Sequence, residues 1–316
     1  MSMDVIFFGT GDIGLPAFNW LLSSKHRVLG VVSQPDKPAG RNQELRASVI
    51  KQRALDAGLR CLQPVRLREP ENIGAIQAMA PDLIVVMAYG QILPRAILEL
   101  PRVACLNLHA SLLPRHRGAA PIQASIEAGD LESGVTVMYM AEGLDTGDIL
   151  LEKRIPMGRG ETGGSLHDRL AELAPEALAE AVALLEEGRA SRVCQNESEA
   201  TYAGKLTRES GELEWSEAGA VDRRVRAMNP WPGAYTWIRE GEGLRKLKVY
   251  AVNPGGAPSL EASGGQVLAT DDRGILVAAG EGSVWLTEVQ LEGKRRMSAR
   301  DFLRGHPVRL GQLLGR

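Results

Sequence analysis

The chain has 316 residues, enough for two domains, because a single hydrophobic core rarely grows beyond about 250–300 residues. Hydrophobic residues make up 44% of it and charged residues 24%, values typical of globular proteins, so disordered and coiled-coil chains are excluded. The formal net charge of -2 excludes binding to nucleic acid through overall positive charge, although it is compatible with a local basic patch.

Cysteine usage and the N-terminal sequence bear on the cellular compartment. Cys61, Cys105 and Cys194 are odd in number and far apart, which argues against a disulfide framework and a metal-binding CxxC pair. The chain opens MSMDVIFFGTG, without the basic segment of a secretory signal, and no apolar run reaches the roughly 18 residues that span a bilayer. We therefore expect a cytoplasmic protein without a membrane partner.

The first half of the sequence alternates short apolar runs with helical patterns. Continuous apolar runs at 5–8, 28–32, 83–87 and 103–107 are typical of parallel strands that are covered on both faces. Helical patterns follow at 45–57 and 70–79, and a long helix rich in Ala, Leu and Glu is expected at 164–187. This order predicts a doubly wound, mostly parallel, Rossmann-like α/β sheet in a first domain at 1–189.

A polar segment without periodicity follows, and we interpret residues 190–208 as a linker. A second domain is expected at 209–316, with a helix near 218–228. Five short strands with Gly-rich turns, at 235–239, 247–252, 266–269, 275–278 and 283–290, predict a small OB-like β-barrel.

Charge is distributed unevenly along the chain. From Lys205 onward there are 17 Lys and Arg against 14 Asp and Glu, although the whole chain is slightly acidic. Either the C-terminal part meets an anionic partner, or the difference is a chance fluctuation.

The sequence Gly9-Thr-Gly11-Asp-Ile-Gly14 matches the dinucleotide-binding pattern GxGxxG and lies between a predicted strand and a predicted helix. That fingerprint also requires an acidic residue at the end of the second strand. The sequence has Ser33-Gln34-Pro35 there, and Asp36 lies beyond the proline. We interpret the glycines as a tight turn and keep a nicotinamide-dependent dehydrogenase as an alternative.

Asn107 and His109 are the pair of residues that indicates a catalytic site. Side chains alternate along a strand, so these two project to the same face near the carboxyl end of a predicted sheet strand, where ligands bind in this architecture. The amide can stabilise the oxyanion of an acyl-transfer intermediate, and the imidazole can exchange a proton near neutral pH. Cys105 shares that face, and we interpret it as a small core residue.

A carboxylate is needed to orient the histidine. The turn Glu142-Gly-Leu-Asp145-Thr-Gly-Asp148 supplies two candidates, Asp145 and Asp148, and their spacing does not decide between them. A purely structural role, in which such an aspartate caps backbone amides, is the alternative.

Several motifs resemble the folate-dependent formyltransferases, and among them the branch that acts on methionyl-tRNA. They are NLHASLLP at 107–114, RHRGAAPIQ at 115–123, GLDTG at 143–147, QPDKPAGR at 34–41, AYGQILP at 88–94, NPWP at 229–232 and GKRRMSA at 293–299. The resemblance covers nearly the whole chain. It implies 10-formyltetrahydrofolate as formyl donor and the amino group of methionyl initiator tRNA as acceptor. No metal is expected, because no cluster of His, Cys and Asp has the spacing of metal ligands.

The resemblance also assigns residues to roles. It implies that Asn107, His109 and Asp145 are catalytic, which selects Asp145 over Asp148. The implied folate-binding residues are Ser111, Leu112, Leu113, Pro114, Tyr89, Gly90, Gln91, Ile92 and Leu93. The implied tRNA-binding residues are Arg41, Lys294, Arg295 and Arg296, and the C-terminal barrel is implied to be the tRNA-binding module. We expect a monomer. A solvent-exposed turn is the alternative for the cluster from Lys294 to Arg296.

One departure from the family pattern concerns tRNA. Asn42-Gln-Glu44 follows Arg41, where the family often has a lysine-rich stretch, so we expect fewer phosphate contacts there. Arg46 and Lys51 are the cations available to compensate.

Other classes of protein remain as rivals. A formyltransferase that acts on a sugar nucleotide would share the Asn, His and Asp pattern, whereas one that acts on glycinamide ribonucleotide would lack the C-terminal barrel. An RNA-binding protein that uses the barrel alone would leave the polar strand end unexplained.

Overall fold

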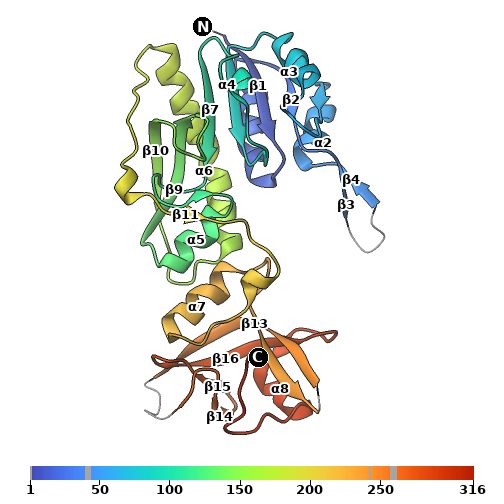
Figure 1. Ribbon diagram of the computed structural model, residues 1–316, viewed down its shortest axis with the longest axis vertical. Coiled ribbons are helices and arrows are strands. Elements are labelled where there is room, and N and C mark those ends of the chain that lie inside the picture. The colour runs from blue at the N-terminus through green and yellow to red at the C-terminus, as the bar shows by residue number, and fades with distance from the viewer. Residues whose placement is uncertain (1, 40–43, 242, 257–261) are drawn as a thin grey trace. The chain divides into compact units, whose positions relative to one another are not determined.

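The computed structural model describes residues 2–39, 44–241, 243–256 and 262–316 (Figure 1). The chain divides into two compact units. Unit 1 comprises Met1–Pro121, Glu132–Pro156 and His167–Gly204, and unit 2 comprises Ile122–Leu131, Met157–Leu166 and Lys205–Arg316. Of the sequence-predicted site residues, Arg41 lies outside the described residues.

A seven-stranded sheet forms the centre of unit 1, in the order β10-β9-β7-β6-β1-β2-β5. The strands are β1 (Asp4–Gly9), β2 (Arg27–Val32), β5 (Cys61–Leu62), β6 (Leu83–Met87), β7 (Ala104–His109), β9 (Glu132–Tyr139) and β10 (Ile149–Pro156). Strands β5, β2, β1, β6 and β7 are parallel, while β9 runs antiparallel to β7 and β10 antiparallel to β9. The mostly parallel, Rossmann-like sheet expected from the apolar runs is confirmed.

Local sequence explains where the helices of this part of the chain begin. They are η1 (Asp12–Gly14), α1 (Leu15–Ser23), α2 (Val49–Asp56), α3 (Pro70–Gln77), α4 (Arg95–Leu98), α5 (Pro121–Ala128) and α6 (Gly163–Glu186). Pro16 and Pro70 lie at the first positions of α1 and α3, where a missing N–H costs nothing. The Ser48 hydroxyl caps α2 by accepting from the Lys51 amide at 3.1 Å.

The helix expected at 45–57 begins only at Val49. Residues Glu44–Arg46 form β4, which pairs with β3 (Lys37–Ala39) as a separate antiparallel hairpin. Strand pairing therefore overrides the helical pattern of the first residues of that stretch, and the Ser48 cap fixes the true start of the helix.

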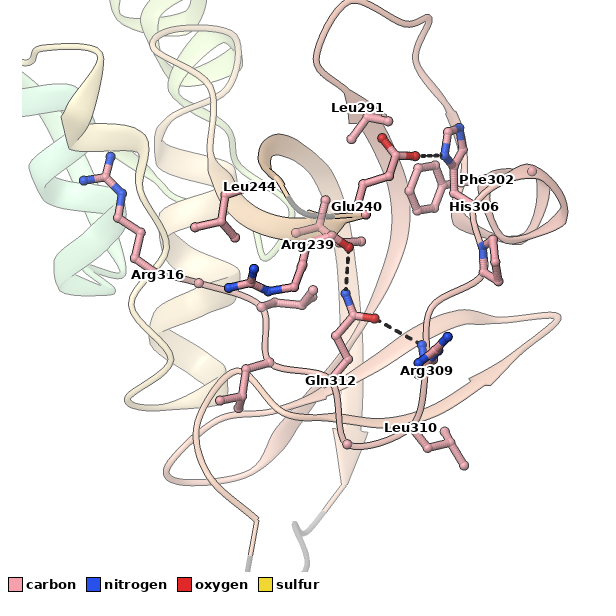
Figure 2. Close-up of a pocket in the computed structure, with 18 of the residues that line it drawn as sticks. Arg239, Glu240, Leu244, Leu291, Phe302, His306, Arg309, Leu310, Gln312 and Arg316 are labelled. Atoms are coloured by element: carbon pink, nitrogen blue, oxygen red, sulfur yellow. Dashed lines mark hydrogen bonds and ion pairs between the residues drawn. The ribbon is translucent and has the colours of Figure 1, made fainter.

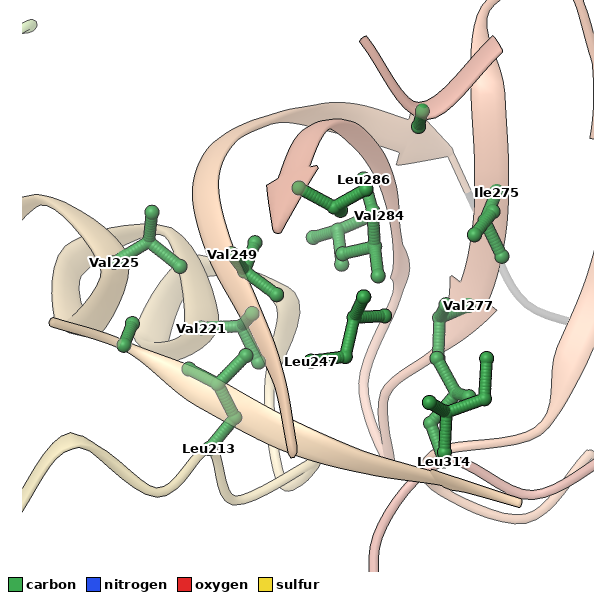
Figure 3. Packing of buried hydrophobic residues seen from close by; sticks show 14 of the residues in the cluster. Leu213, Val221, Val225, Leu247, Val249, Ile275, Val277, Val284, Leu286 and Leu314 are labelled. Atoms are coloured by element: carbon green, nitrogen blue, oxygen red, sulfur yellow. The ribbon is translucent and has the colours of Figure 1, made fainter. Parts of the chain in front are cut away.

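Unit 2 is built on an antiparallel sheet of small-barrel type, in the order β12-β13-β16-β15-β14, with β17 beside β16. Its elements are α7 (Ala218–Ala227), β12 (Tyr235–Glu240), β13 (Gly243–Gly256), β14 (Val267–Asp271), β15 (Gly274–Ala278), β16 (Ser283–Leu291), β17 (Met297–Ser298) and α8 (Ala299–Gly305). Figure 3 shows its core, in which Val221 and Val225 of α7 pack with Leu247 and Val249 of β13. The five strands predicted in this region are confirmed.

The polar segment after α6 makes specific contacts within unit 1. Val193 exchanges two backbone hydrogen bonds with Ile149, and β11 (Tyr202–Ala203) pairs with β8 (Arg117–Gly118). Two short 3₁₀ turns, η2 (Glu197–Glu199) and η3 (Glu209–Gly211), lie in and just beyond it. Among the described helices, none has both the length and the apolarity that a membrane crossing requires.

Candidate active site

The site begins with two polar side chains on an interior strand. Asn107 and His109 lie on β7, between β6 and β9, and their side chains are only 9% and 6% exposed. Because they are two residues apart, they project from the same face of the strand. The structure therefore brings together the pair that the sequence predicted.

Asp145 meets both side chains. Its Oδ1 accepts a hydrogen bond from Asn107 Nδ2 at 3.4 Å, and its Oδ2 lies 3.7 Å from His109 Nδ1. The Gly118 amide donates to the same Oδ2 at 2.8 Å. Asp148 instead lies 3.6 Å from the Arg192 guanidinium. The geometry thus places Asp145 next to Asn107 and His109.

The position of His109 fixes which of its nitrogens can exchange a proton. Nε2 lies 2.9 Å from the main-chain oxygen of His116, and a carbonyl oxygen can only accept a hydrogen bond. Nε2 therefore carries the hydrogen in the neutral ring. Nδ1, the nitrogen that faces Asp145, is left to gain and lose a proton.

One member of this trio, Asp145, and the neighbouring His116 have left-handed backbone conformations. Asp145 has φ of 52° and His116 has φ of 59°, which for residues other than glycine costs about 1–2 kcal/mol each. A strained backbone conformation of this kind persists only where contacts with neighbouring residues maintain it. The side chains of Gln195 and Thr201 supply such contacts, and sequence reasoning missed both residues because they lie in a polar segment without periodicity.

Two of the four predicted folate-binding residues after β7 are held by hydrogen bonds, one within their loop and one to β9. Ser111 Oγ donates to the Arg115 oxygen at 2.7 Å, and the Leu113 amide donates to Thr136 Oγ1 at 3.1 Å. Ser111 and Leu113 are buried, whereas Leu112 and Pro114 are partly exposed. The structure thus presents parts of this loop to solvent at the carboxyl end of β7.

The predicted folate-binding residues after β6 lie at the end of the neighbouring parallel strand. Tyr89 and Leu93 are buried, and burial raises the pKa of the Tyr89 hydroxyl. Gln91 is tied to the Pro64 oxygen and the Leu67 amide, each at 2.9 Å. Ile92 is 80% exposed, and Gly90 has φ of 87°. The backbone and Ile92 are the parts of this loop that a ligand can reach.

The predicted basic cluster of unit 2 is only partly available. Lys294, Arg295 and Arg296 are all exposed. The guanidinium of Arg296 is bound by the Glu288 carboxylate at 2.6 and 2.7 Å and covers the Tyr250 ring. Lys294 and Arg295 are therefore the two members better placed to meet an anionic partner.

A second basic surface, not predicted from the sequence, lies on the β12–β13 ladder. Thr236, Ile238, Leu247 and Val249 face the core, so alternation turns their neighbours along each strand to the opposite side of the ladder. We define the residues on this opposite side as the basic face: Tyr235, which is buried, and Trp237, Arg239, Leu244, Lys246 and Lys248.

Cations and aromatic rings are interleaved on the basic face. Lys246 Nζ lies 3.8 Å from the centre of the Tyr235 ring, and the Arg316 guanidinium lies 4.7 Å from the centre of the Trp237 ring. One carboxylate, that of Glu212, accepts from the Tyr235 hydroxyl and the Trp237 indole. The cations of this face suit the phosphates of a nucleic acid, whereas the buried Tyr235 ring is not available to stack on a base.

A pocket of about 910 Å³ adjoins the basic face. Figure 2 shows Arg239, Arg309 and Arg316 around it, with Gln312 hydrogen-bonded to the backbones of the first two. Within the described part of the chain, Arg239 and Arg309 have no carboxylate at ion-pair distance. The Glu240 carboxylate is occupied by Arg245 and His306, which lower its pKa. Arg239 already belongs to the basic face and Arg316 lies 3.6 Å from the Glu212 carboxylate, so the pocket adds Arg309 to that face.

Comparison with known proteins identifies the family. The family model described as formyl transferase matches residues 3–182, and that of the formyl transferase C-terminal domain matches residues 205–307. The chain belongs to the formyl transferase family. It is accordingly a formyl-transferring enzyme.

Named relatives match over almost the full length of this family member. A methionyl-tRNA formyltransferase of Akkermansia muciniphila is 45% identical over 311 residues, which cover 96% of this chain and 97% of the relative. One from Pseudomonas fluorescens is 46% identical over 314 residues, covering 98% and 97%.

Solved structures show the same fold at lower sequence identity. HypX from Aquifex aeolicus, in complex with tetrahydrofolic acid, matches with a TM-score of 0.61 and 20% identity over 96% of this chain. This chain spans about half the length of HypX, 47% of it. Among the described residues, no group of three His, Cys, Asp or Glu side chains is arranged to hold a metal ion.

Proposed function

We propose that this enzyme transfers a formyl group from 10-formyltetrahydrofolate to the amino group of methionyl initiator tRNA, in the cytoplasm and as a monomer. The observation that carries the proposal is the convergence of Asn107, His109 and Asp145 at the carboxyl end of β7. It occurs in a chain that is 40–46% identical to named methionyl-tRNA formyltransferases.

In the proposed reaction, the neutral amine attacks the formyl carbon of the donor. An α-amine has a pKa of about 8, so a useful fraction is neutral at physiological pH. A C–N bond forms to the methionyl nitrogen, and the bond from the formyl carbon to the folate nitrogen breaks. One proton moves overall from the amine to the departing folate nitrogen, so atoms and charges balance.

The three site residues divide this chemistry between them. The Asn107 amide donates a hydrogen bond to the oxyanion of the tetrahedral intermediate, a contribution typically worth about 10²–10³ in rate. His109 Nδ1 takes up and returns the proton, because Nε2 is held by the His116 oxygen. The Asp145 carboxylate stabilises the protonated imidazole and, through Oδ1, orients the amide.

The donor is proposed to lie over the loops after β6 and β7. These strands are parallel neighbours, so both loops leave the same edge of the sheet beside Asn107 and His109. A side chain built at Gly90 would meet only Gln34 Nε2, at 3.9 Å, so the backbone there is open to a ligand. The exposed Ile92 offers an apolar contact for a flat heterocycle.

The acceptor is proposed to use the cations of unit 2. Lys294 and Arg295 are retained as phosphate contacts, and the basic face is added to them. Arg41 is proposed as a tRNA contact because the motif at 34–41 resembles that of the family. Each phosphate contact contributes to a salt-dependent affinity, with a slope of about 0.7–0.9 per contact in log Kd against log salt.

The proposal is tested by formylation of charged tRNA. The enzyme is incubated with 10-formyltetrahydrofolate and either methionyl initiator tRNA or an amino-sugar nucleotide, and the products are analysed by mass. We expect a gain of one formyl group on methionine released from the tRNA and none on the sugar. Formylation of the sugar nucleotide alone, or of neither acceptor, would contradict the proposal.

A further inference from the structure

Residues 193–203, which we call the strap, contact the loops that carry Asp145 and His116. The strap is anchored at one end by Val193 on Ile149 and at the other by the pairing of β11 with β8. All of it belongs to unit 1, as do Asn107, His109 and Asp145. It therefore lies where its side chains can influence the site.

Arg117 links the strap to the loop beside the site. Its side chain is fully buried, and its guanidinium donates two hydrogen bonds to Gln195 Oε1 at 2.8 and 3.0 Å. Two more go to the carboxylate of Glu197, at 2.7 and 2.9 Å. A guanidinium can only donate, so the oxygen of the Gln195 amide must face Arg117.

The other end of the Gln195 amide holds the Asp145 turn. Its Nε2 donates to the main-chain oxygens of Asp145 and Gly147, at 2.8 and 2.7 Å. Both hydrogens of the amide are therefore used on the turn that keeps Asp145 left-handed. From that conformation the Asp145 carboxylate meets Gly118, Asn107 and His109.

Thr201 provides the same support on the histidine side. Its Oγ1 accepts from the His116 amide at 2.8 Å, and its main-chain oxygen accepts from the Arg117 amide at 2.8 Å. His116 is the other left-handed residue, and its carbonyl oxygen receives His109 Nε2–H. The strap thus contacts both backbone segments that orient the site.

We propose that Gln195 and Thr201 are positioning residues, which hold Asp145 and His109 in their reactive orientations. The proposal rests on the proposed function of the site. It adds that hydrogen bonds from the strap to main-chain atoms of the Asp145 and His116 loops contribute to the rate of formyl transfer.

Kinetics of matched variants test the assignment of Gln195. Gln195→Met keeps the size of the side chain and removes its hydrogen bonds. We expect kcat to fall by about tenfold or more, because displacement of a catalytic group by about 1 Å is that costly, with KM for both substrates within about twofold. Glu199→Gln changes an exposed strap residue whose carboxylate accepts a hydrogen bond from Asn196 Nδ2, and we expect wild-type kinetics.

A double-variant comparison separates positioning from general damage. If Gln195 acts through Asp145, Gln195→Met should cost less than about threefold in an Asp145→Asn background, because the same function is already lost. Equal costs in both backgrounds would overturn the proposal. So would a Gln195→Met enzyme with normal kcat.

Thr201 gives an independent comparison, should Gln195→Met fail to fold. Thr201→Ser keeps the hydroxyl, and we expect it to retain near-normal kcat. Thr201→Val keeps the shape without the acceptor, and we expect a loss of about tenfold. Equal activity of the two variants would contradict a positioning role for this residue.

Amide exchange gives a readout that does not depend on activity. The Gly118 amide is protected by Asp145 Oδ2, so its hydrogen exchange, followed by NMR, should accelerate in Gln195→Met. Unchanged protection of that amide would refute the positioning role even if turnover fell. Accelerated exchange in an enzyme that does not formylate tRNA would instead keep the positioning role and reject the proposed function.

Discussion

His109 Nε2 lies 2.9 Å from the main-chain oxygen of His116, which turns Nδ1 toward the carboxylate of Asp145. One hydrogen bond therefore determines which nitrogen is available for chemistry. The acceptor is a backbone atom, so its position is set by the left-handed conformation of His116, whose φ is 59°. The conformation of the loop that carries His116 consequently determines which nitrogen of His109 can exchange a proton.

Removal of either polar group of β7 should abolish most of the activity. We expect Asn107→Ala and His109→Ala each to lower the single-turnover formylation rate by about 10²-fold or more. Neither side chain contributes to the apolar core, so circular dichroism and thermal melting should show a folded protein. Near-normal formylation by both variants would remove these residues from the mechanism.

The Gly147 position should be intolerant of any side chain. A Cβ placed there would lie 1.8 Å from the main-chain oxygen of Tyr139, so Gly147→Ala must displace the Asp145 turn. We expect at least a tenfold loss of kcat, as a displacement of about 1 Å can cost a factor of 10². Gly74→Ala in α3 is the control, because its Cβ meets nothing within 4 Å.

The control should even be stabilised, by about 0.5–1 kcal/mol, since alanine favours a helix more than glycine does. Thermal melting and turnover are measured on both proteins. A Gly147→Ala enzyme that is as active as Gly74→Ala would show that the turn can shift without consequence for Asp145.

Sequence patterns predicted the parts of this molecule that depend on apolar burial. The strands of unit 1 were recognisable because both faces of β1 and β6 are covered, which produces uninterrupted apolar runs. Asn107 and His109 were recognisable because strand alternation places them on one face. Spacing could not separate Asp145 from Asp148, because that difference depends on how a turn packs against Gly118.

The strap was not predictable for a related reason. Its contacts join polar side chains such as Gln195 and Thr201 to main-chain atoms far away in the sequence, and such contacts leave no periodicity. The segment was therefore interpreted as a linker. The basic face was missed because its pattern appears only once the register of β12 against β13 is known.

Substitutions on the basic face should weaken binding of tRNA without changing binding of the folate donor. We expect Lys246→Ala combined with Lys248→Ala to raise KM for methionyl-tRNA and to reduce the salt slope by about 1 for each lost phosphate contact. KM for the folate should not change. Arg304→Ala, which removes an exposed cation paired with Asp301, is the matched control.

Binding is measured at several salt concentrations, because affinity at a single concentration does not report the number of contacts. Equal salt slopes for the wild type and the double variant would exclude this face from the tRNA interface. A change in Arg304→Ala of the same size would mean that overall charge alone is responsible.

Cys105 and Cys194 should differ in reactivity. Burial raises the pKa of Cys105 to about 12, and the thiolate is the reactive form, so this thiol should resist alkylation in the native protein between pH 7 and pH 9. Cys194 is exposed and should react first, faster as pH rises, although the Asp148 carboxylate raises its pKa.

Peptide mapping after timed treatment with iodoacetamide checks this order. Cys105 should become modified only when the protein is unfolded in denaturant. Modification of Cys105 at the rate of Cys194 in the native protein would contradict its burial in the core beside β6.

The strap has a consequence for how enzymes of this kind can be recombined. A chimera that grafts the first 189 residues onto a foreign acceptor-recognition module would discard Gln195 and Thr201 together. A junction placed after Gly204 would carry both along. A junction for exchanging modules therefore belongs after the strap. A chimera that is joined before the strap would contain Asn107, His109 and Asp145 but would lack the residues that hold the Asp145 and His116 loops.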